Sequence, residues 1–530
     1  MSVSSLPFLH GALAAVLPKL AAWRRDFHAH PEAGWTEFRT AALIIRRLRE
    51  LGYAIRMGEA ACASDRRMGV PSSAVLAAAR ERALEHGADA ELVAGMGDGY
   101  TGFWADLDCG PGPVTAFRFD MDCNEVAECA EESHRPVREG FASRWPGLMH
   151  ACGHDGHAAV GLGLAEVLVS IRRHLRGRIR LIFQPAEEGA RGALPMSEAG
   201  AVDGVDVLFG FHIGFKAEGP GSLICGTQGF LATTKRDVLF SGVPAHAGAA
   251  PEEGKDALLA ACSAVVNLHA ISRNGKGGTR IAVGRLEGGE ARNVIPASAR
   301  LFMETRGETT ELDAYMTAES ERILRASADL WGCACEWRTV GNSAGGGSSP
   351  ELARLIATVA EAMGGWKTVI PMSGFGATED FACLMSRVQA SGGLASYLQV
   401  GTDRAAGHHS DRFDFDETCL GRALELLARL AVRMAGGGQE DTETETESDM
   451  EFLDEVVRRK GIHVQLWLEG EDGEGFGRGR VELLQLVDEL GSLSKAAKQL
   501  GMSYRGAWGK IKKAERIAGE TLVDASGTKR

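Results

Sequence analysis

The sequence lacks three features that would each define a class of protein. No apolar run reaches the roughly 20 residues that span a bilayer, and the apolar stretch 6–22 is broken by Lys19 and has no basic residues before it, unlike a signal peptide. Eleven cysteines, an odd number without framework spacing, do not indicate a disulfide scaffold. A net charge of −13 excludes a protein whose whole surface binds nucleic acid, because phosphate binding needs concentrated Lys and Arg. These absences predict a soluble, cytoplasmic protein that contacts no membrane.

A chain of 530 residues with 45% hydrophobic and 24% charged residues is long enough for two or three buried cores. Short β-type runs alternate with helical patterns from about residue 100 to 215, which is typical of an α/β sheet. From about residue 231 the order strand, helix, two strands, helix predicts a small α+β domain inserted in the larger one. The predicted segments are a catalytic α/β domain (1–228 and 339–435), an inserted α+β domain (229–338), an acidic linker (436–458) and a C-terminal module (459–530). The linker follows from the lack of any basic residue between Gly436 and Leu453, where seven acidic residues repel one another.

The strongest chemical signal is the stretch His150-Ala-Cys-Gly-His-Asp-Gly-His157. Thiolate, imidazole and carboxylate are ligands for divalent transition metals. Cys152 and His154 lie two residues apart, so on a loop their side chains can converge on one metal centre. Asp155 is placed to accept a hydrogen bond that fixes an imidazole tautomer.

A second signal is the adjacent pair Glu187 and Glu188, which follows an apolar strand. Neighbouring side chains at a strand end point in different directions. One carboxylate can therefore bind metal while the other takes a proton from water. Either cluster alone could be a polar surface loop, but the two together favour a metal centre.

Several segments together resemble one family, the metallo-amidohydrolases related to aminoacylases, hippurate hydrolase and plant auxin-conjugate hydrolases. The resemblance covers about Lys19 to Met434 and is most marked toward the A-type chains of p-aminobenzoyl-glutamate hydrolases. The segments that carry it, besides the two above, are Trp23–His28, Gly34–Thr40, Phe117–Asp122, Ser133–Pro136, Ala245–Gly248, Arg292–Pro296, Gly407–His409 and Phe413–Glu417.

The resemblance implies an α/β catalytic domain like those of metal-dependent aminopeptidases and carboxypeptidases. It implies two divalent ions per site, with manganese favoured and zinc possible, and Glu187 as the general base for a metal-activated water. The metal ligands that it implies are Cys152, His154, Glu188, His212 and His409. His408 competes with His409, and the family's spacing to Phe413 favours His409. His28, Asp120 and Asp122 recur in the family pattern and are interpreted as supporting or structural residues.

For the inserted domain the resemblance implies dimerisation and lid closure. There His246 resembles the imidazole that polarises the scissile carbonyl in the partner's site, while Asn293 and Arg306 resemble groups that hold the substrate carboxylate. A guanidinium suits bidentate capture of a carboxylate, although Arg306 could equally be a solvated charge at a strand end. The expected substrate is an N-acyl or N-aroyl amino acid, with p-aminobenzoyl-glutamate favoured. The expected assembly is a homodimer or a hetero-oligomer with a related B-type subunit.

The C-terminal module reverses the charge of the chain, with eleven Lys or Arg against six Asp or Glu from Arg478 to Arg530. Two short helical patterns, the turn at Gly501 and a basic helical pattern predict a helix-turn-helix. The segment resembles the N-terminal domain of molybdate-responsive regulators but stops before a wing hairpin, an incomplete winged helix. The candidate DNA-binding residues are Ser503, Tyr504, Arg505 and Lys510. A helical packing module with a solvated basic face is the alternative.

Two functions follow from these patterns. The first is a metal-dependent amidohydrolase. The second is a DNA-binding regulator that uses a hydrolase-derived domain as a small-molecule sensor. A sensor has no need of the general base Glu187, which favours the enzyme.

Overall fold

A computed structural model describes residues 6–435, 468–469, 475–476, 495 and 498. The chain divides into two compact units, residues 1–452 and 453–530. The described part of the second unit contains one pair of two-residue strands, β16 (Leu468–Glu469) and β17 (Gly475–Phe476). The predicted linker and the tentative DNA-binding residues Ser503, Tyr504, Arg505 and Lys510 lie outside the described residues. No helix in the described part of the chain is long and apolar enough to cross a membrane.

The first unit is built on an eight-stranded mixed sheet, ordered β1-β2-β4-β3-β5-β15-β6-β13. The strands are β1 (Ala54–Met57), β2 (Phe103–Asp108), β4 (Arg178–Gln184), β3 (Val114–Asp120), β5 (Val207–Glu218), β15 (Leu394–Thr402), β6 (Ser222–Ile224) and β13 (Thr368–Ile370). The central strands β4, β3, β5 and β15 run parallel to their neighbours in this set. Their carboxyl ends therefore meet at one edge of the sheet, where sites of α/β proteins form.

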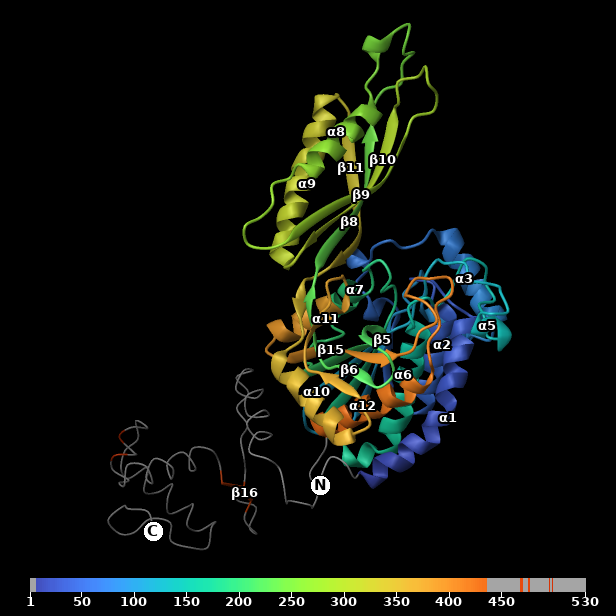
Figure 1. Ribbon diagram of the computed structural model, residues 1–530, viewed down its shortest axis with the longest axis vertical. Helices are drawn as coiled ribbons and strands as arrows, with labels where there is room; N and C mark the ends of the chain where they lie inside the picture. Colours follow the sequence, from blue (N-terminus) through green and yellow to red (C-terminus); the bar gives the residue numbers. More distant parts are fainter. Residues whose placement is uncertain (1–5, 436–467, 470–474, 477–494, 496–497, 499–530) are drawn as a thin grey trace. The chain divides into compact units, whose positions relative to one another are not determined.

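Helices cover this sheet and connect its strands (Figure 1). They are α1 (Pro7–Ala29), α2 (Phe38–Glu50), α3 (Ser73–Glu85), α4 (Ala90–Gly95), α5 (Arg135–Arg138), α6 (His154–Ser170), α7 (Ala193–Glu198), α10 (Pro350–Met363), α11 (Phe381–Ala390) and α12 (Thr418–Ala435). A small sheet ordered β12-β7-β14 comprises Gly346–Gly347, Thr227–Phe230 and Ser373–Gly374.

Helix α6 is buried along its length because it packs between the sheet and the helices α1 and α12. It is apolar on nearly every side, as a helix with no solvent face must be. Gly161 lies where a Cβ atom would stand 2.7 Å from the Phe119 ring, so glycine allows the helix to approach strand β3 closely. This packing holds the first turn of α6, which carries His154 and Asp155, against the carboxyl end of β3.

The second sheet is fully antiparallel, in the order β11-β8-β10-β9, and packs against helices α8 and α9. Its elements are β8 (Ala232–Ser241), α8 (Ala257–His269), β9 (Thr279–Gly288), β10 (Ser298–Gly307), α9 (Thr310–Leu330) and β11 (Ala334–Ser343). The side chains of Asp256 and Thr309 cap the two helices by accepting hydrogen bonds from backbone N–H groups one turn later. The predicted α/β fold with an inserted α+β domain is confirmed; the exact boundaries 229 and 338 stay a prediction.

A buried ion cluster ties the first helix to the loop before the last one. The Arg24 guanidinium, fully buried, donates to Asp155 at 2.8 Å and to Asp414 at 2.9 Å. Arg135 donates to both oxygens of Asp414. Although burial by itself raises the pKa of Asp414, the hydrogen bond from Arg135 and the charge of Arg24 lower it below its usual range. The same balance lowers the pKa of Glu417, which accepts from Arg25.

These lowered pKa values are expected to make the protein sensitive to acid. A carboxyl group whose pKa is lower in the folded state stabilises the fold above its unfolded pKa, and that stability is lost as the pH falls through the folded value. The unfolded values of Asp414 and Glu417 are 3.8 and 4.5. Urea unfolding between pH 7 and pH 3 should therefore show stability falling below about pH 4.5, with a shallower fall in the Asp414→Asn variant.

The exposed residue Asp65 offers a matched control, since its side chain lies on the surface. Asp65→Asn should keep the pH slope of the wild type. A slope for Asp414→Asn that equals the wild-type slope would contradict the assignment of acid sensitivity to this cluster.

Candidate metal centre

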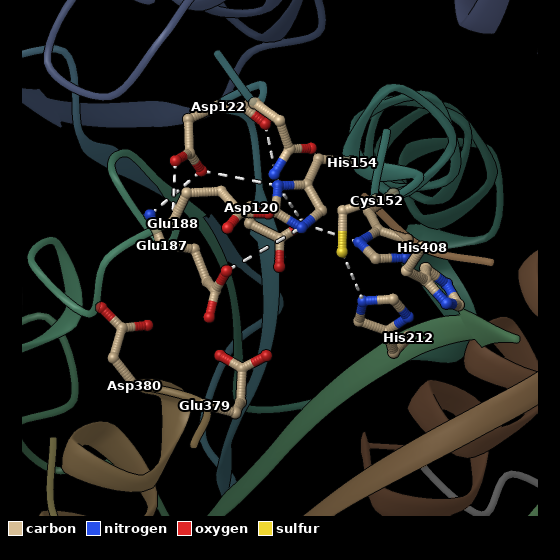
Figure 2. A network of polar contacts seen from close by, with 12 residues as sticks. Asp120, Asp122, Cys152, His154, Glu187, Glu188, His212, Glu379, Asp380 and His408 are labelled. Atoms are coloured by element: carbon tan, nitrogen blue, oxygen red, sulfur yellow. Dashed lines mark hydrogen bonds and ion pairs between the residues drawn. The ribbon is translucent and has the colours of Figure 1, made fainter. Parts of the chain in front are cut away.

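Cys152 and His154 lie at the start of helix α6, on either side of Gly153. The backbone at Gly153 has φ 92°, in the left-handed region that glycine adopts without strain. The turn brings the Cys152 Sγ within 3.4 Å of the His212 Nε2, although the two residues are 60 positions apart in sequence. His212 comes from strand β5, at the same edge of the sheet (Figure 2).

His154 is oriented by a hydrogen bond from its Nδ1 to the backbone oxygen of Asp122, at 2.8 Å. Its Nε2 faces Glu187, whose Oε2 lies 4.0 Å away, and is buried without a hydrogen-bond partner among the described residues. Burial opposes a charge on the ring, but Asp120 and Cys152 raise the pKa of His154 well above its usual value. This surplus of nearby negative charge suits a bound cation, which would supply the positive charge in place of the proton.

The His212 ring is also oriented by a hydrogen bond to a backbone oxygen. Its Nδ1 donates to the backbone oxygen of Ile213 at 2.8 Å, which leaves the Nε2 lone pair directed toward Cys152. Burial, together with the nearby rings of His157 and His408, lowers the pKa of His212 well below its usual value. The ring is therefore neutral, which is the form that binds metal.

Glu187 and Glu188 lie in the loop after strand β4 and share one anchor. The backbone N–H groups of both residues donate to the carboxylate of Asp122, at 3.0 and 2.9 Å. The Glu188 Oε1 then lies 3.2 Å from the Nε2 of His409. Although burial raises the pKa of Glu188, His409 and His154 outweigh it and lower that pKa to about 2, so Glu188 is ionised.

Glu187 has the opposite electrostatic setting. Burial and the charges of Glu379 and Glu188 raise its pKa well above the ordinary carboxyl value. A carboxylate with a raised pKa can take and return a proton near neutral pH, which is what a general base must do. The surroundings thus shift the pKa values of the two adjacent carboxyl groups in opposite directions, as expected for a general base beside a metal ligand.

The possible ligand side chains fall into overlapping groups. Within each group, the possible ligand atoms all lie within 4.8 Å of one another. Cys152 belongs both to a group with His154 and His212 and to a group with Glu188 and His409. Burial raises the pKa of the Cys152 thiol to about 12, so a neighbouring cation is needed for it to bind as thiolate. All five predicted ligands are therefore brought together, and the donor set of sulfur, imidazole and carboxylate fits transition-metal ions.

His408, the competing histidine, has both ring nitrogens engaged. Its Nδ1 lies 2.9 Å from Arg404 Nη1, and its Nε2 lies 3.2 Å from the backbone oxygen of Ile213. His409 has φ 66°, a left-handed backbone conformation that directs its ring toward Glu188. The geometry thus favours His409 over His408 as the ligand.

A buried polar network behind the centre was missed in the sequence, apart from Asp120. Arg118 is fully buried and donates to Asp120, to Glu379 at 3.0 Å and to Asp380 at 3.3 Å. Asp380 in turn accepts from the backbone N–H groups of Gly192 and Ala193, which fixes the far end of the loop that carries Glu187. Figure 2 shows Glu379 and Asp380 near Glu187. The sequence signal that could have revealed this network is another adjacent acidic pair, Glu379 and Asp380, which stands directly before helix α11.

The residues predicted to touch substrate lie in the inserted domain. His246 is exposed and pairs across a β-bridge with Val294, next to Asn293. The Arg306 guanidinium donates to Glu304 at 2.8 Å. Within residues 6–435, no hydrogen bond or ion pair joins His246, Asn293 or Arg306 to the predicted metal ligands. Their predicted roles stay proposals.

A buried cluster of cysteine, histidine and carboxylate at the carboxyl ends of parallel strands, in a catalytic domain with an α+β insertion, defines an α/β metallohydrolase. Comparison with known proteins makes the class more specific. The chain belongs to the peptidase family M20/M25/M40, whose model matches residues 116–433. Residues 479–530 match a second model, that of the bacterial regulatory helix-turn-helix proteins of the lysR family. The resemblance to molybdate-responsive regulators in particular stays a prediction.

Similar proteins align with about four fifths of this chain and with nearly the whole of their own length. The chain is 46% identical over 420 residues to the A-type chain of p-aminobenzoyl-glutamate hydrolase from Escherichia coli (strain K12), covering 79% of this chain and 96% of that protein. It is 44% identical over 429 residues to indole-3-acetyl-aspartic acid hydrolase of Enterobacter agglomerans, covering 81% and 98%. A crystal structure of an aminobenzoyl-glutamate utilization protein from Klebsiella pneumoniae is 39% identical with a TM-score of 0.68, covering 80% and 98%. A Bacillus subtilis M20 protein described as a dinuclear metal binding peptidase is 25% identical with a TM-score of 0.55, covering 79% and 98%.

Proposed function

We propose that this protein is a metal-dependent amidohydrolase that cleaves the amide bond of an N-acyl or N-aroyl amino acid, with p-aminobenzoyl-glutamate as the favoured substrate. The observation that carries the proposal is the geometry of the centre, where Cys152 belongs to two groups of possible metal ligands and the Glu187 Oε2 lies 4.0 Å from the His154 Nε2. Two relatives more than 40% identical are named as hydrolases of amides of glutamate and aspartate. This supports an acidic amino acid on the leaving side.

Cys152, His154, Glu188, His212 and His409 would hold two divalent ions, for which we propose manganese, with zinc as the alternative. When bound, such ions supply Lewis acidity toward a water molecule and toward the amide carbonyl. Glu187 takes the proton of the attacking water and returns it to the leaving nitrogen. Asp122 keeps Glu187 and Glu188 in place through their backbone N–H groups. His246, Asn293 and Arg306 are proposed to bind the carbonyl and the free carboxylate of the substrate.

The proposal is tested by incubating the purified, manganese-loaded protein with p-aminobenzoyl-glutamate, hippurate and a panel of N-acetyl amino acids. Release of free amino acid from p-aminobenzoyl-glutamate in preference to the others is the expected result. Absence of hydrolysis across the panel, with metal bound and with the protein folded, would refute the hydrolase assignment for the chain by itself.

Metal binding is expected to stabilise the fold, because the ligands come from segments that only the folded chain brings together. A ligand that binds only the native state at 100 times its Kd adds about 2.7 kcal/mol to the free energy of unfolding. Removal of metal by a chelator should therefore lower the melting temperature, and manganese should restore it. Cys152→Ala should abolish the shift, whereas the control Cys262→Ala, at an exposed cysteine of helix α8, should keep it. A full shift in Cys152→Ala would contradict the ligand assignment.

For the assembly, we propose a homodimer, or a hetero-oligomer with a related B-type subunit. The name of the Escherichia coli relative, which designates one lettered subunit of a hydrolase, supports a second kind of subunit. Light scattering on the purified chain, with and without a co-expressed B-type partner, distinguishes the two. Eleven cysteines, all of them free, favour a cytoplasmic location.

A second candidate function is DNA binding by the C-terminal module, which the match to lysR-type helix-turn-helix proteins supports. Fluorescence anisotropy of the full chain with duplex DNA should show an affinity that falls steeply as salt rises, because Lys and Arg displace counterions from phosphates. The double variant Arg505→Ala, Lys510→Ala should weaken binding. Binding that is absent at low salt, or that salt does not change, would leave the module as a packing element. The sensor-only alternative is not favoured, since the base and the proposed ligands are all present.

A further inference from the structure

Phe215 stands beside the metal centre in a backbone conformation that phenylalanine rarely adopts. Its φ is 63°, in the left-handed region, where a residue other than glycine is strained. The distortion follows from the pairing of strands β5 and β15, in which Val400 pairs with Ile213 and Thr402 pairs with Glu218. Residues 214–217 therefore stand opposite the single residue 401 and bulge out of the ladder. A bulge changes the direction of the side chains on the bulged strand, and bulges are common next to active sites.

The bulge places the Phe215 ring between the proposed metal ligands and the apolar core. On one side its centroid lies 5.9 Å from the His212 ring and 5.7 Å from the His408 ring. On the other side it stacks on Phe375 at 4.5 Å, with an angle of 25° between the ring planes. Phe375 is buried, and its ring in turn contacts Phe230 at 4.8 Å. Phe215 is thus the half-buried end of an aromatic cluster that begins in the core and ends at the site.

This position matters for the acyl side of an amide. If the scissile carbonyl binds beside His212, whose ring centroid lies 5.9 Å from that of Phe215, an acyl group that extends toward Phe215 contacts its ring. An aromatic ring prefers an offset-stacked or edge-to-face partner with centroids about 4.5–7 Å apart, beyond what area burial supplies. The methyl group of an acetyl amide gains little from contact with the same ring. Stacking on the buried Phe375 restricts the Phe215 ring before substrate binds, which lowers the entropic cost of binding.

We propose that Phe215, supported by Phe375, is the acyl-side wall of the site and selects amides whose acyl group is aromatic. The inference rests on the proposed function, since it assigns the acyl side of the same centre. It identifies a specificity-determining residue, and the strain at φ 63° is the feature that aims the ring.

The test compares p-aminobenzoyl-glutamate with N-acetyl-glutamate, which share the amino acid and differ only in the acyl group. Phe215→Gly removes the ring at a backbone conformation that glycine adopts without strain, so the fold should be retained. The ratio of kcat/KM for the aroyl over the acetyl substrate should fall by about tenfold in this variant. Phe302→Ala, which removes a ring from strand β10 of the inserted domain, should leave the ratio at its wild-type value.

Calorimetric binding of the same two compounds to the Glu187→Gln protein, with and without Phe215→Gly, gives a second readout that requires no turnover. Loss of the preference for the aroyl compound in the Phe215→Gly protein supports the role of Phe215 as the acyl-side wall. An unchanged ratio in both measurements overturns it. If the wild type cleaves neither compound, the proposed function fails, and the calorimetric preference still decides the role of Phe215.

Discussion

The Glu187→Gln variant is expected to lose about 100- to 10,000-fold in kcat for p-aminobenzoyl-glutamate, the usual contribution of a positioned general base. Glutamine has the shape of glutamate but cannot take a proton from water. Its backbone N–H would still donate to Asp122, so the loop and the neighbouring ligand Glu188 should stay in place. The metal content, measured by elemental analysis, should therefore equal that of the wild type.

The combination of lost turnover and retained metal is what separates a base from a ligand. Glu198→Gln, at an exposed glutamate of helix α7, is the matched control and should keep the wild-type kcat. Turnover within about threefold of the wild type in Glu187→Gln would remove this residue from the mechanism. A parallel loss of metal would instead assign it to the coordination shell.

The Arg118→Met variant is expected to lose about 3–5 kcal/mol in free energy of unfolding, the usual effect of removing one partner of a buried ion cluster. Arg118 is 1% exposed and is the shared donor to Asp120, Glu379 and Asp380. Without the guanidinium, these buried carboxyl groups lose their shared hydrogen-bond donor and the positive charge that faces them. Urea unfolding of the metal-free protein measures the change without the contribution of bound ions.

Arg338→Met provides the comparison for a surface pair, because Arg338 has a side chain 78% exposed and pairs with Asp237. Exposed ion pairs contribute little, so this variant should unfold close to the wild type. If Arg118→Met shifted the unfolding midpoint no more than Arg338→Met, the buried network would not be a source of stability. If the Arg118→Met protein kept its stability but bound a different amount of metal, the network would serve the metal centre and not the stability of the fold.

The order of helices and strands was predictable because each element has a local pattern. The apolar run Ile179–Phe183 predicts strand β4, observed as Arg178–Gln184, and the helical pattern Glu311–Ala328 predicts helix α9, observed as Thr310–Leu330. Periodicity and capping act over a few residues, and both are readable in the chain. The order of the strands in the sheet could not be read in this way, because β15 pairs with β5 from almost 190 residues away.

The predicted ligand pair Cys152 and His154 was also a local signal, since both stand in one short motif. His212 and His409 were assigned through family resemblance, because a lone histidine carries no local sign of what it faces. The structure brings His212 and His409 each into a group of possible ligands that includes Cys152, and it engages both nitrogens of the neighbouring His408 elsewhere. Glu379 and Asp380 were missed because their role depends on Arg118, some 260 residues earlier in the chain.

The sequence by itself therefore determined the chemistry that is available: a thiol and an imidazole two residues apart before a helix, and two adjacent carboxylates after a strand of an α/β frame. Only the tertiary structure decided which carboxyl group has a lowered pKa and which a raised one, since the pKa of each depends on burial and on charges from distant segments. It also decided where Phe215 points, because a bulge exists only once two strands have paired. Local patterns are encoded along the chain, whereas pKa values and bulges arise from contacts that the chain makes only when folded.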